Sequence, residues 1–505
     1  MKHTYKSILA LSLLVALVLS SCKRQLDIPP RNQLDAGQAL TTRAGMEAAV
    51  NSVYSVLKGV RQYGRDHFSV PDAMADIAFA NGRSNRLINE NRNQALANMA
   101  NWQTSYNAIN EINLNLKAIP NIPDASDADR RRWTGELSFL RALYYFDLVK
   151  NYAYIPTFVV ASQNRGGVVL QLEGFDNATA AVNYRPSRAS IQECYAQIMR
   201  DIYTALANLS VSNRGRNYAS GHAALALGSR VALYEGNWAR ADSFATAAIN
   251  ATGGIGSLTN TGNYVAGWRA ADHPEGIFQV WYATLAENIG VNESLAATHT
   301  TLSAPGAWNL PRQGQGDLVP NAFLLTNLGI SGFPAGLVSG ATPPPTLTYS
   351  NDIRNRLFEW GVNAAGRYVE CTKWMGKNGN PNWDNTVVLR WAELYLNRAE
   401  ARYHLGQESL AYADLNVIRA ARYVGFTPPA TPDFTGPALL EEILRQRMLE
   451  FAFEGQRWYD LKRYGRDINK TNPSVSMPAT DFRILPRIPL NEIEGNPNMQ
   501  QNFGY

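Results

Sequence analysis

Two stretches of the chain, LALGSRVALYEGNWARADSFATAAI at residues 225–249 and YLNRAEARYHLGQESLAYADLNVI at residues 395–418, decide the fold because they share one pattern. Each places small and apolar residues at helical spacing on both sides of a glycine, Gly236 in the first stretch and Gly406 in the second. A glycine lets the chain turn sharply between two helices, and small side chains let those helices cross closely. Several such pairs stacked together form a superhelix with a concave face. We therefore predict a mainly α fold, a tetratricopeptide-like helical-repeat superhelix.

Further helical patterns lie on either side of these two stretches. Apolar residues recur every three or four positions from about Thr42, as a half-buried helix requires, and similar patterns predict helices at 101–119 and 127–152. Helix is also expected to return at Val387 and again from 437 to 463. The predicted scaffold is therefore helical at both ends of the chain.

The segment from about 253 to 386 has a different character. Helical periodicity fades there, Gly, Pro, Asn and Thr become frequent, and short alternating apolar runs such as 277–281 predict strands. We expect a loop-rich insertion with short strands, which makes the C-terminal half of the fold irregular. Long loops on a rigid scaffold are where binding surfaces usually lie.

The N-terminus has the pattern of a bacterial lipoprotein signal. Lys2 and Lys6 form a basic start, and an apolar run follows at 8–19, which is too short to span a bilayer but long enough for a signal-peptide core. The run ends in the sequence LSSC at 19–22, in which small residues precede a cysteine whose thiol can be acylated. The alternative is an ordinary secretory signal that contains a cysteine. We predict that Cys22 is lipidated, and stable anchoring would need two or more acyl chains.

These patterns divide the chain into three parts. We predict a signal peptide at 1–21, a lipidated cysteine and extended tether at 22–36, where Pro29 and Pro30 lie, and a single domain at 37–505. No second apolar run approaches 18 residues, so everything after the anchor is expected to lie in water.

Charge and cysteine content exclude some classes of function. Loss of Lys2 and Lys6 lowers the formal net charge only from +5 to +3, and no Lys/Arg-rich run indicates nucleic-acid binding. Cys194 and Cys371 could form one disulfide in an oxidising compartment or remain two buried thiols. We favour thiols.

Motifs for catalysis are missing from the sequence. It contains no GxSxG, HExxH or phosphate-binding GxxxxGK[ST] motif, and its six His residues show no metal-ligand spacing. We therefore predict a protein that is not an enzyme, with no catalytic residues, no metal ligands and no cofactor, although scattered Asp and Asn oxygens leave a calcium site open. The charged residues Glu450, Glu454, Arg457 and Asp460 are expected to form a semi-buried ion-pair network along one helix.

Longer blocks of the sequence resemble one family. The run GELSFLRALYYFDLV at 135–149 is similar to the signature helix of SusD/RagB-like outer-membrane nutrient-binding lipoproteins. The runs at 389–401 and 450–463 and the C-terminal tail at 484–502 resemble the same family, and Glu450-Phe451-Ala452-Phe453-Glu454-Gly455-Gln456-Arg457-Trp458-Tyr459-Asp460 is the most distinctive of them. The blocks occur in the family's order and span nearly the whole chain, lipobox included.

The resemblance implies a function and a partner. Such proteins use four tetratricopeptide-like helix pairs as a scaffold, bind oligosaccharides or in some members peptides, and close as a hinged lid over a SusC-like TonB-dependent outer-membrane transporter. It implies an outer-membrane, lipid-anchored protein that faces the cell surface. One departure is that Lys23 and Arg24 are basic, where many surface-exposed lipoproteins of this kind carry acidic residues after the cysteine. The resemblance therefore supports anchoring more strongly than export to the outer face.

Five residues are candidates for ligand binding. A flexible sugar chain is held by flat aromatic faces and by polar groups that meet its hydroxyls. Trp308 lies in an irregular Pro- and Gly-containing stretch, and Trp281 ends a strand-like run. His67, Asn81 and Arg83 belong to a region that we interpret as a polar loop between the first helices and that resembles a ligand-side loop of the family.

Five other tryptophans are expected to have structural roles, and three other functions compete with glycan capture. We assign to packing the tryptophans on predicted helices or in the family-wide blocks, Trp102, Trp133, Trp238, Trp391 and Trp458. Capture of peptides by the same architecture is an alternative to glycan capture. A surface hydrolase would need paired carboxylates or an activated nucleophile, and a pure assembly module would hold only protein partners.

Overall fold

The computed structural model describes residues 40–210, 214–251, 258–334, 343–363, 366–470 and 475–505. The predicted signal peptide, Cys22 and the tether lie outside the described residues. Within the described ranges no helix is both long enough and apolar enough to cross a membrane.

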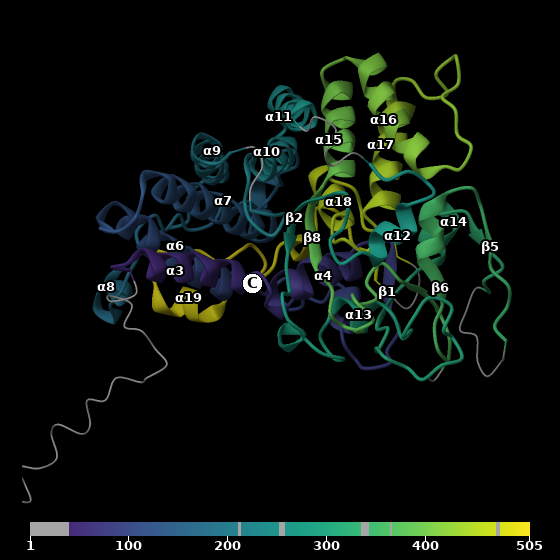
Figure 1. The fold of residues 1–505 in the computed structure, drawn as a ribbon, viewed down its shortest axis with the longest axis horizontal. Coiled ribbons are helices and arrows are strands. Elements are labelled where there is room, and N and C mark those ends of the chain that lie inside the picture. The colour runs from purple at the N-terminus through teal and green to yellow at the C-terminus, as the bar shows by residue number, and fades with distance from the viewer. Residues whose placement is uncertain (1–39, 211–213, 252–257, 335–342, 364–365, 471–474) are drawn as a thin grey trace, which may run out of the picture.

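The helices of the scaffold pack side by side along the molecule (Figure 1). The predicted helix at 127–152 is α7 and has those bounds, and it begins with a capping box in which Ser126 and Asp129 bind each other's backbone N–H groups. Nearly every residue of α7 after Trp133 is buried, because helices pack on several of its sides. The scaffold helices are α3 (Arg43–Val56), α6 (Trp102–Ala118), α7 (Asp127–Tyr152), α9 (Ile191–Asn208), α10 (Gly221–Glu235), α11 (Trp238–Asn250), α15 (Trp391–His404), α16 (Glu408–Arg422) and α17 (Pro437–Glu450).

The two stretches that predicted helix pairs are helix pairs. The first forms α10 and α11, and the second forms α15 and α16. Gly236 and Gly406 lie between the helices with φ of 77° and 72°, a left-handed conformation that costs other residues more. Because α11 also packs against α15, the two pairs are neighbours in space. The predicted mainly α, tetratricopeptide-like fold class is confirmed.

The rest of the chain is irregular, as expected, and short two-stranded antiparallel sheets connect its segments. The strands are β1 (Ala78–Ala80) with β3 (Leu318–Pro320), β2 (Gly276–Val280) with β8 (Thr386–Arg390), β4 (Ile330–Ser331) with β5 (Thr348–Tyr349), and β6 (Phe358–Trp360) with β7 (Val369–Cys371). Short helices lie between them and at the chain ends, namely α4 (Asp66–Met74), α5 (Ile88–Asn91), α8 (Ala178–Asn183), α12 (Tyr264–Arg269), α13 (Leu295–His299), α14 (Ala322–Asn327), α18 (Arg457–Arg463) and α19 (Leu490–Gly495). Single π or 3₁₀ turns occur at η1 (Val60–Gly64), η2 (Ile119–Asn121), η3 (Ala161–Gln163), η4 (Leu285–Glu287), η5 (Ile353–Leu357) and η6 (Phe482–Ile484).

Two predicted helix boundaries are wrong. Helix does not return at Val387, since this residue lies in β8, whose β-branched residues pair with β2, and α15 begins only at Trp391. The helix predicted at 437–463 is broken into α17 and α18, because Phe453 and Gly455 both have positive φ. A Cβ atom on Gly455 would overlap the backbone of α4 at the carbonyl oxygen of His67, so close packing of two segments favours glycine at this break.

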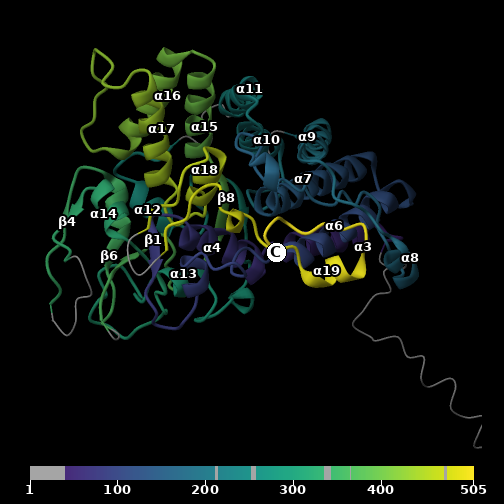
Figure 2. The same ribbon diagram turned by 180° about the vertical axis from the view of Figure 1, so that it is seen from behind.

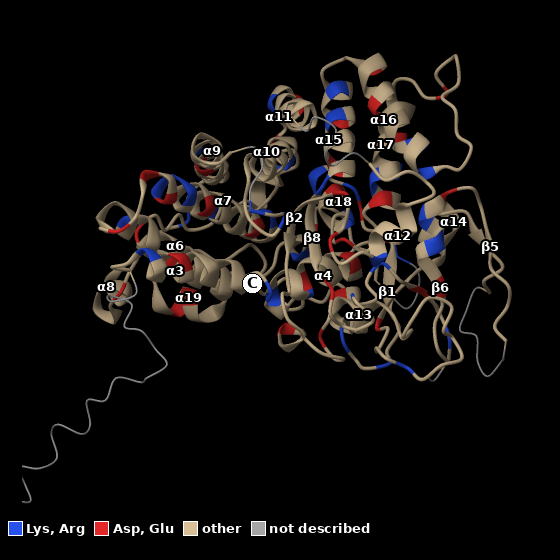
Figure 3. Cartoon of the chain, in the orientation of Figure 1, with Lys and Arg blue, Asp and Glu red and all other residues tan. Residues whose placement is uncertain are grey.

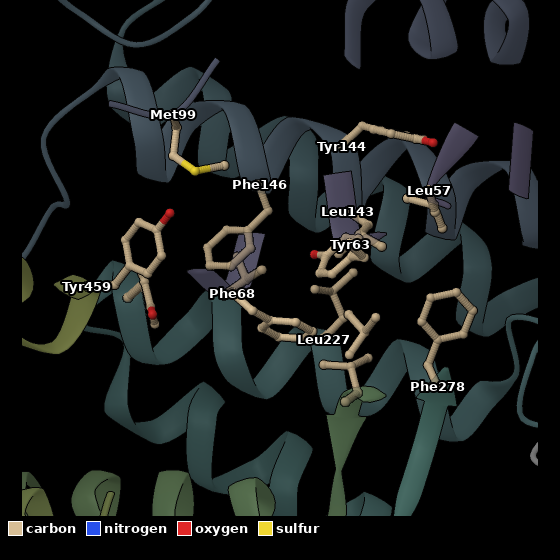
Figure 4. Close-up of a cluster of buried hydrophobic side chains, with 14 of the residues drawn as sticks. Leu57, Tyr63, Phe68, Met99, Leu143, Tyr144, Phe146, Leu227, Phe278 and Tyr459 are labelled. Atoms are coloured by element: carbon tan, nitrogen blue, oxygen red, sulfur yellow. The ribbon is translucent and has the colours of Figure 1, made fainter. Parts of the chain in front are cut away.

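A hydrophobic core joins the helical scaffold to the irregular half. Phe68 from α4, Phe146 from α7, Leu227 from α10 and Phe278 from β2 point toward one another, with Tyr459 from α18 beside them (Figure 4). Four of the five tryptophans assigned to packing are buried, Trp102, Trp133, Trp391 and Trp458. The fifth, Trp238, is half-buried and stacks on His404 with the ring centroids 4.0 Å apart.

Cys194 and Cys371 are free and buried, so the preference for thiols is confirmed, and burial raises the pKa of both.

A second, charged centre lies at the end of α17. The carboxylate of Glu450 accepts hydrogen bonds from Arg390 at 2.6 Å, from Arg422 at 2.9 Å and from Arg354 at 3.4 Å. Arg422 also binds Glu275 at 2.8 Å, and each of these side chains is at most 2% exposed. We refer to Glu275, Arg354, Arg390, Arg422 and Glu450 as the buried ion cluster.

The buried ion cluster corrects one expectation about the 450–460 region. Glu450, Glu454, Arg457 and Asp460 do form ion pairs, but not along one helix. Each binds a residue of another segment, as with Glu454 and Lys373, Arg457 and Asp76, and Asp460 and Arg447. The charges therefore hold elements together across the fold instead of fixing the register of a helix.

Replacement of Glu450 by Gln is expected to lower the free energy of unfolding by about 3–5 kcal/mol, because three buried guanidinium groups lose their shared carboxylate. The arginines hold the pKa of Glu450 well below its usual value of 4.5, so its contribution is complete above that pH and is lost as the pH falls. Urea unfolding at pH 7 and pH 4 measures both effects. Glu441→Gln is the matched control, since Glu441 pairs with Arg466 at an exposed site and should cost less than about 1 kcal/mol. Equal losses in the two variants would contradict the argument.

Candidate functional site

The five candidate ligand residues are best located relative to the short helix α13. Ser294 caps this helix, accepting a hydrogen bond from the Ala297 N–H, and its hydroxyl contacts the amide oxygen of Asn382 at 2.8 Å. At the other end, the Thr301 N–H donates to the carboxylate of Glu370 at 2.6 Å. A helix of five residues spans only about 7.5 Å, so the segments held at its two ends are close together.

Trp281 lies near the first end of α13. It follows β2 and is half-buried beside Lys377, whose ammonium nitrogen is 4.7 Å from the centre of the Trp281 ring and 4.4 Å from that of Trp383. Lys377 also donates to the carbonyl oxygen of Tyr282 at 2.6 Å, and partial burial lowers its pKa to about 8. The two indoles and the amine form a fixed aromatic arrangement at the edge of the loop region.

Asn81 and Arg83 lie near the other end of α13. The Asn81 amide donates to the carbonyl oxygen of Gly316 at 2.5 Å, and the guanidinium of Arg83 donates to Glu370 at 2.6 Å. Arg83 lies 5.1 Å from the ring centre of Tyr368, and its side chain is only 4% exposed. The predicted loop exists, but the charge of Arg83 is already used inside the protein.

Trp308 contacts the 366–370 segment, which also carries the partner of Arg83. Its ring lies 5.0 Å from the guanidinium of Arg367, three residues before the Glu370 that binds Arg83. Trp308 itself is half-buried in a loop whose neighbouring residue Gly306 donates to Glu359 at 2.6 Å. We refer to Asn81, Arg83, Trp281, Trp308 and Trp383 as the α13 surface.

His67 is not part of the α13 surface, and the expectation that it lies in a polar loop is wrong. It belongs to α4, is 4% exposed, and stacks on Tyr63 with the ring centroids 4.5 Å apart. Burial lowers its pKa to about 4, and its ring contacts the Gln62 amide oxygen at 3.0 Å. The α4 segment is helical because its side chains fill the space between α18, β1 and η1, which the polar composition of the sequence did not reveal.

The sequence reasoning missed Trp383. It lies in KNGNPNW at 377–383, an irregular stretch of the same kind as the one that singled out Trp308, so composition alone could have drawn attention to it. Its Nε1 donates to the carbonyl oxygen of Tyr282 at 3.1 Å, which fixes the indole beside Trp281. Next to it, burial raises the pKa of Asp384 to about 6.

The charges of the described residues are interspersed. In the view of Figure 3, blue and red residues are mixed along the helices. No group of three or more His, Cys, Asp or Glu side chains within the described ranges is placed to hold a metal ion. The arrangement offers aromatic faces for binding.

Two family profiles match this chain. The profile described as "SusD family" matches residues 347–505, and the one described as "Starch-binding associating with outer membrane" matches residues 26–233. The chain belongs to the SusD family. The SusD-like protein P38 of Formosa agariphila is 25% identical, with 97% of this chain and 96% of the relative aligned, and the SusD-like protein P2 of the same organism is 23% identical over 92% and 93%.

Solved structures share the fold of this chain. A SusD superfamily protein of Bacteroides thetaiotaomicron is 26% identical, with a TM-score of 0.76 over 91% of this chain and 99% of the other. A surface glycan-binding protein A of Bacteroides fluxus is 20% identical, with a TM-score of 0.69 over 92% and 100%. The SusD-family blocks that the sequence analysis identified therefore correspond to a shared three-dimensional scaffold.

Replacement of Arg83 by Met in this SusD-family protein is expected to lower stability by about 3–5 kcal/mol, because the buried Glu370 loses its cation. Burial already raises the pKa of Glu370, so the loss should be smallest at acid pH, where the carboxyl is protonated, and should grow as the pH rises. Urea unfolding between pH 4 and pH 8 measures it. The double variant Arg83→Met/Glu370→Gln should recover stability, and Arg92→Met, at an exposed position, is the control. A loss that does not change with pH would contradict this account.

Proposed function

We propose that this protein is an outer-membrane lipoprotein that binds nutrient oligomers, chiefly oligosaccharides, and delivers them to a SusC-like TonB-dependent transporter as a lid. The observation that carries the proposal is membership of the SusD family along nearly the whole chain, since 97% of it aligns with a curated SusD-like relative. The family profile that matches residues 26–233 is described as starch-binding and outer-membrane associated, which favours a glycan over a peptide.

The α13 surface is our proposed ligand surface. Trp281, Trp308 and Trp383 are half-buried, so each has part of its ring available to lie against the C–H face of a sugar. Asn81 and Arg83 support the neighbouring loop from within, Asn81 through the carbonyl oxygen of Gly316 and Arg83 through Glu370. Rigid aromatic side chains lose little rotamer freedom on binding, which suits the capture of a flexible polymer.

Binding alone is sufficient for this role. A hydrolase would need two carboxylates flanking a bond or a nucleophile with its base, and the α13 surface is built from indoles, amides and an internally paired arginine. We therefore propose a protein that is not an enzyme and that hands over its ligand unchanged.

Replacement of Trp281 and Trp308 by Ala is expected to weaken oligosaccharide binding at least tenfold for the pair, because the sugar loses its largest contact areas. Calorimetry with hexasaccharides of α-glucan, β-glucan, xylan and mannan, and with tri- to hexapeptides, measures the affinities. Tyr203→Ala is the control, since Tyr203 is 50% exposed on α9, outside the α13 surface.

Three results would contradict this proposal. Binding of the peptides alone would replace the glycan by a peptide. Undiminished binding by the tryptophan variants, with their fold intact, would move the ligand surface elsewhere. Shortened hexasaccharides after incubation would make the protein a hydrolase.

The anchor is tested separately. Replacement of Cys22 by Ser is expected to abolish incorporation of an alkyne-labelled fatty acid and to move the protein from the outer-membrane fraction to the soluble fraction, because no acyl chain remains to hold it. Cys194→Ser is the control, since that thiol is buried in the folded domain. A Cys22→Ser variant that keeps both the label and its membrane association would contradict lipidation at this residue.

A further inference from the structure

A cavity of about 340 Å³ lies apart from the α13 surface, at the end of the molecule where α8 and α19 are found. It is open to solvent on one side and is lined by α6, by the segment that contains Val169 and continues through α8, and by α19. Figures 1 and 2 both place α8 and α19 beside α3 and α6, far along the longest axis from β6 and α14. Its volume is at the small end of the range of about 300–1,000 Å³ typical of small-molecule sites.

The walls of the cavity are aromatic. Trp102 and Tyr106 are one helical turn apart on α6, with their ring centroids 4.9 Å apart. The ring of Trp102 also packs against that of Tyr152, with the centroids 4.9 Å apart. Tyr184 forms another part of the wall and contacts Phe175 at 4.9 Å. Tyr106 and Tyr184 are both half-buried, so part of each ring faces the open space.

The frame of the cavity is fixed by hydrogen bonds. The Tyr106 hydroxyl donates to the carbonyl oxygen of Val169 at 2.8 Å, the Gln171 amide donates to Asn110 at 3.0 Å, and the Asn496 amide donates to the carbonyl oxygen of Pro186 at 2.7 Å. These bonds tie α6, the 169–186 segment and the end of α19 to one another. The cavity is therefore pre-formed, which reduces the ordering cost of binding.

Other polar groups at the cavity remain available to a ligand. In the part of the chain that the structure describes, the amide groups of Gln103 and Asn107 make no hydrogen bond to another residue, and both line the cavity. Glu492 lines it too, and burial raises the pKa of this carboxyl while its hydrogen bond with Trp102 opposes the shift. Arg185 supplies the opposite charge, so the lining is close to neutral.

We propose that this cavity is a second carbohydrate site, which takes one or two neutral sugar rings independently of the α13 surface. Aromatic rings accept the C–H faces of a sugar, and amide and carboxylate groups around them meet its hydroxyls. The opposite charges of Arg185 and Glu492 in the lining disfavour a ligand of strong net charge, and the volume is too small for an extended peptide. A sugar bound here would be separate from a polymer held at the α13 surface, because different elements, α6, α8 and α19, line the cavity.

Gly495 offers a direct way to close the cavity. A Cβ atom at this position would meet no heavy atom within 4 Å, so a larger side chain can enter the open space without displacing the backbone. Gly495→Trp is therefore expected to fill the cavity with an indole. Glu494→Trp is the matched control, because it adds the same group to the same helix at an exposed position that does not line the cavity.

The test measures binding of D-glucose, D-galactose, D-xylose, maltose and cellobiose to the purified lipoprotein in a polyoxyethylene detergent, which carries no sugar group. Saturation-transfer NMR titrations up to about 50 mM cover the millimolar affinities expected of such small ligands. At least one sugar should bind the natural protein, and Gly495→Trp should weaken that binding at least tenfold. Glu494→Trp should change it less than twofold. In the Trp281→Ala/Trp308→Ala background, which removes any contribution of the α13 surface, Gly495→Trp should still weaken binding at least tenfold.

Two results would overturn the second site. One is the failure of all five sugars to bind the natural protein, and the other is binding to a correctly folded Gly495→Trp variant that stays within twofold. Should Gly495→Trp fail to fold, Gln103→Ala/Asn107→Ala removes the two free amides and must weaken binding at least fivefold, or the proposal is wrong. Since the tryptophan variants report on the α13 surface alone, failure of one site is distinguishable from failure of the other.

Discussion

The structure depends on one buried carboxylate and the arginines around it. Glu450 ends α17, and its partners Arg390, Arg422 and Arg354 come from β8, from the end of α16 and from η5. Charges at such depth are tolerated only when every one of them is paired and hydrogen-bonded. The cluster therefore fixes where the helical pairs meet the irregular half, since a shift of any one element would leave a buried charge without its partner.

This constraint explains how a loop-rich region can present ligand residues on a defined surface. The strand β8 ends in Arg390 and pairs with β2, which leads directly to Trp281. A second buried pair, Arg83 with Glu370, holds the loop of Asn81 against the segment that carries Arg367 and supports Trp308. Trp281 is thus positioned by the end of β2, Trp383 by its bond to the carbonyl oxygen of Tyr282, and Trp308 by a segment that the Arg83–Glu370 pair holds in place.

The candidate site was predictable only in part. Trp281 and Trp308 could be chosen because indoles in irregular segments have no automatic place in a core, and both are half-buried in the structure. His67 was misjudged because a polar neighbourhood in the sequence suggested a loop, whereas α4 buries the ring against Tyr63. Trp102 was correctly assigned to packing, yet one edge of it also lines a cavity, and a residue with both roles looks like a core residue in sequence.

The sequence by itself determined the fold class, the helix pairs at 225–249 and 395–418, the α7 helix and the family, because periodicity and turn glycines are local properties of the chain. Only the tertiary structure decided that residues 386–390 form a strand, that the helix breaks after Glu450, and that Arg83 is committed to Glu370. These outcomes depend on partners up to 287 residues away in the chain. Long-range pairing, close approach of backbones and the neutralisation of buried charge leave no signature in the neighbouring residues, so they become visible only when the chain is folded.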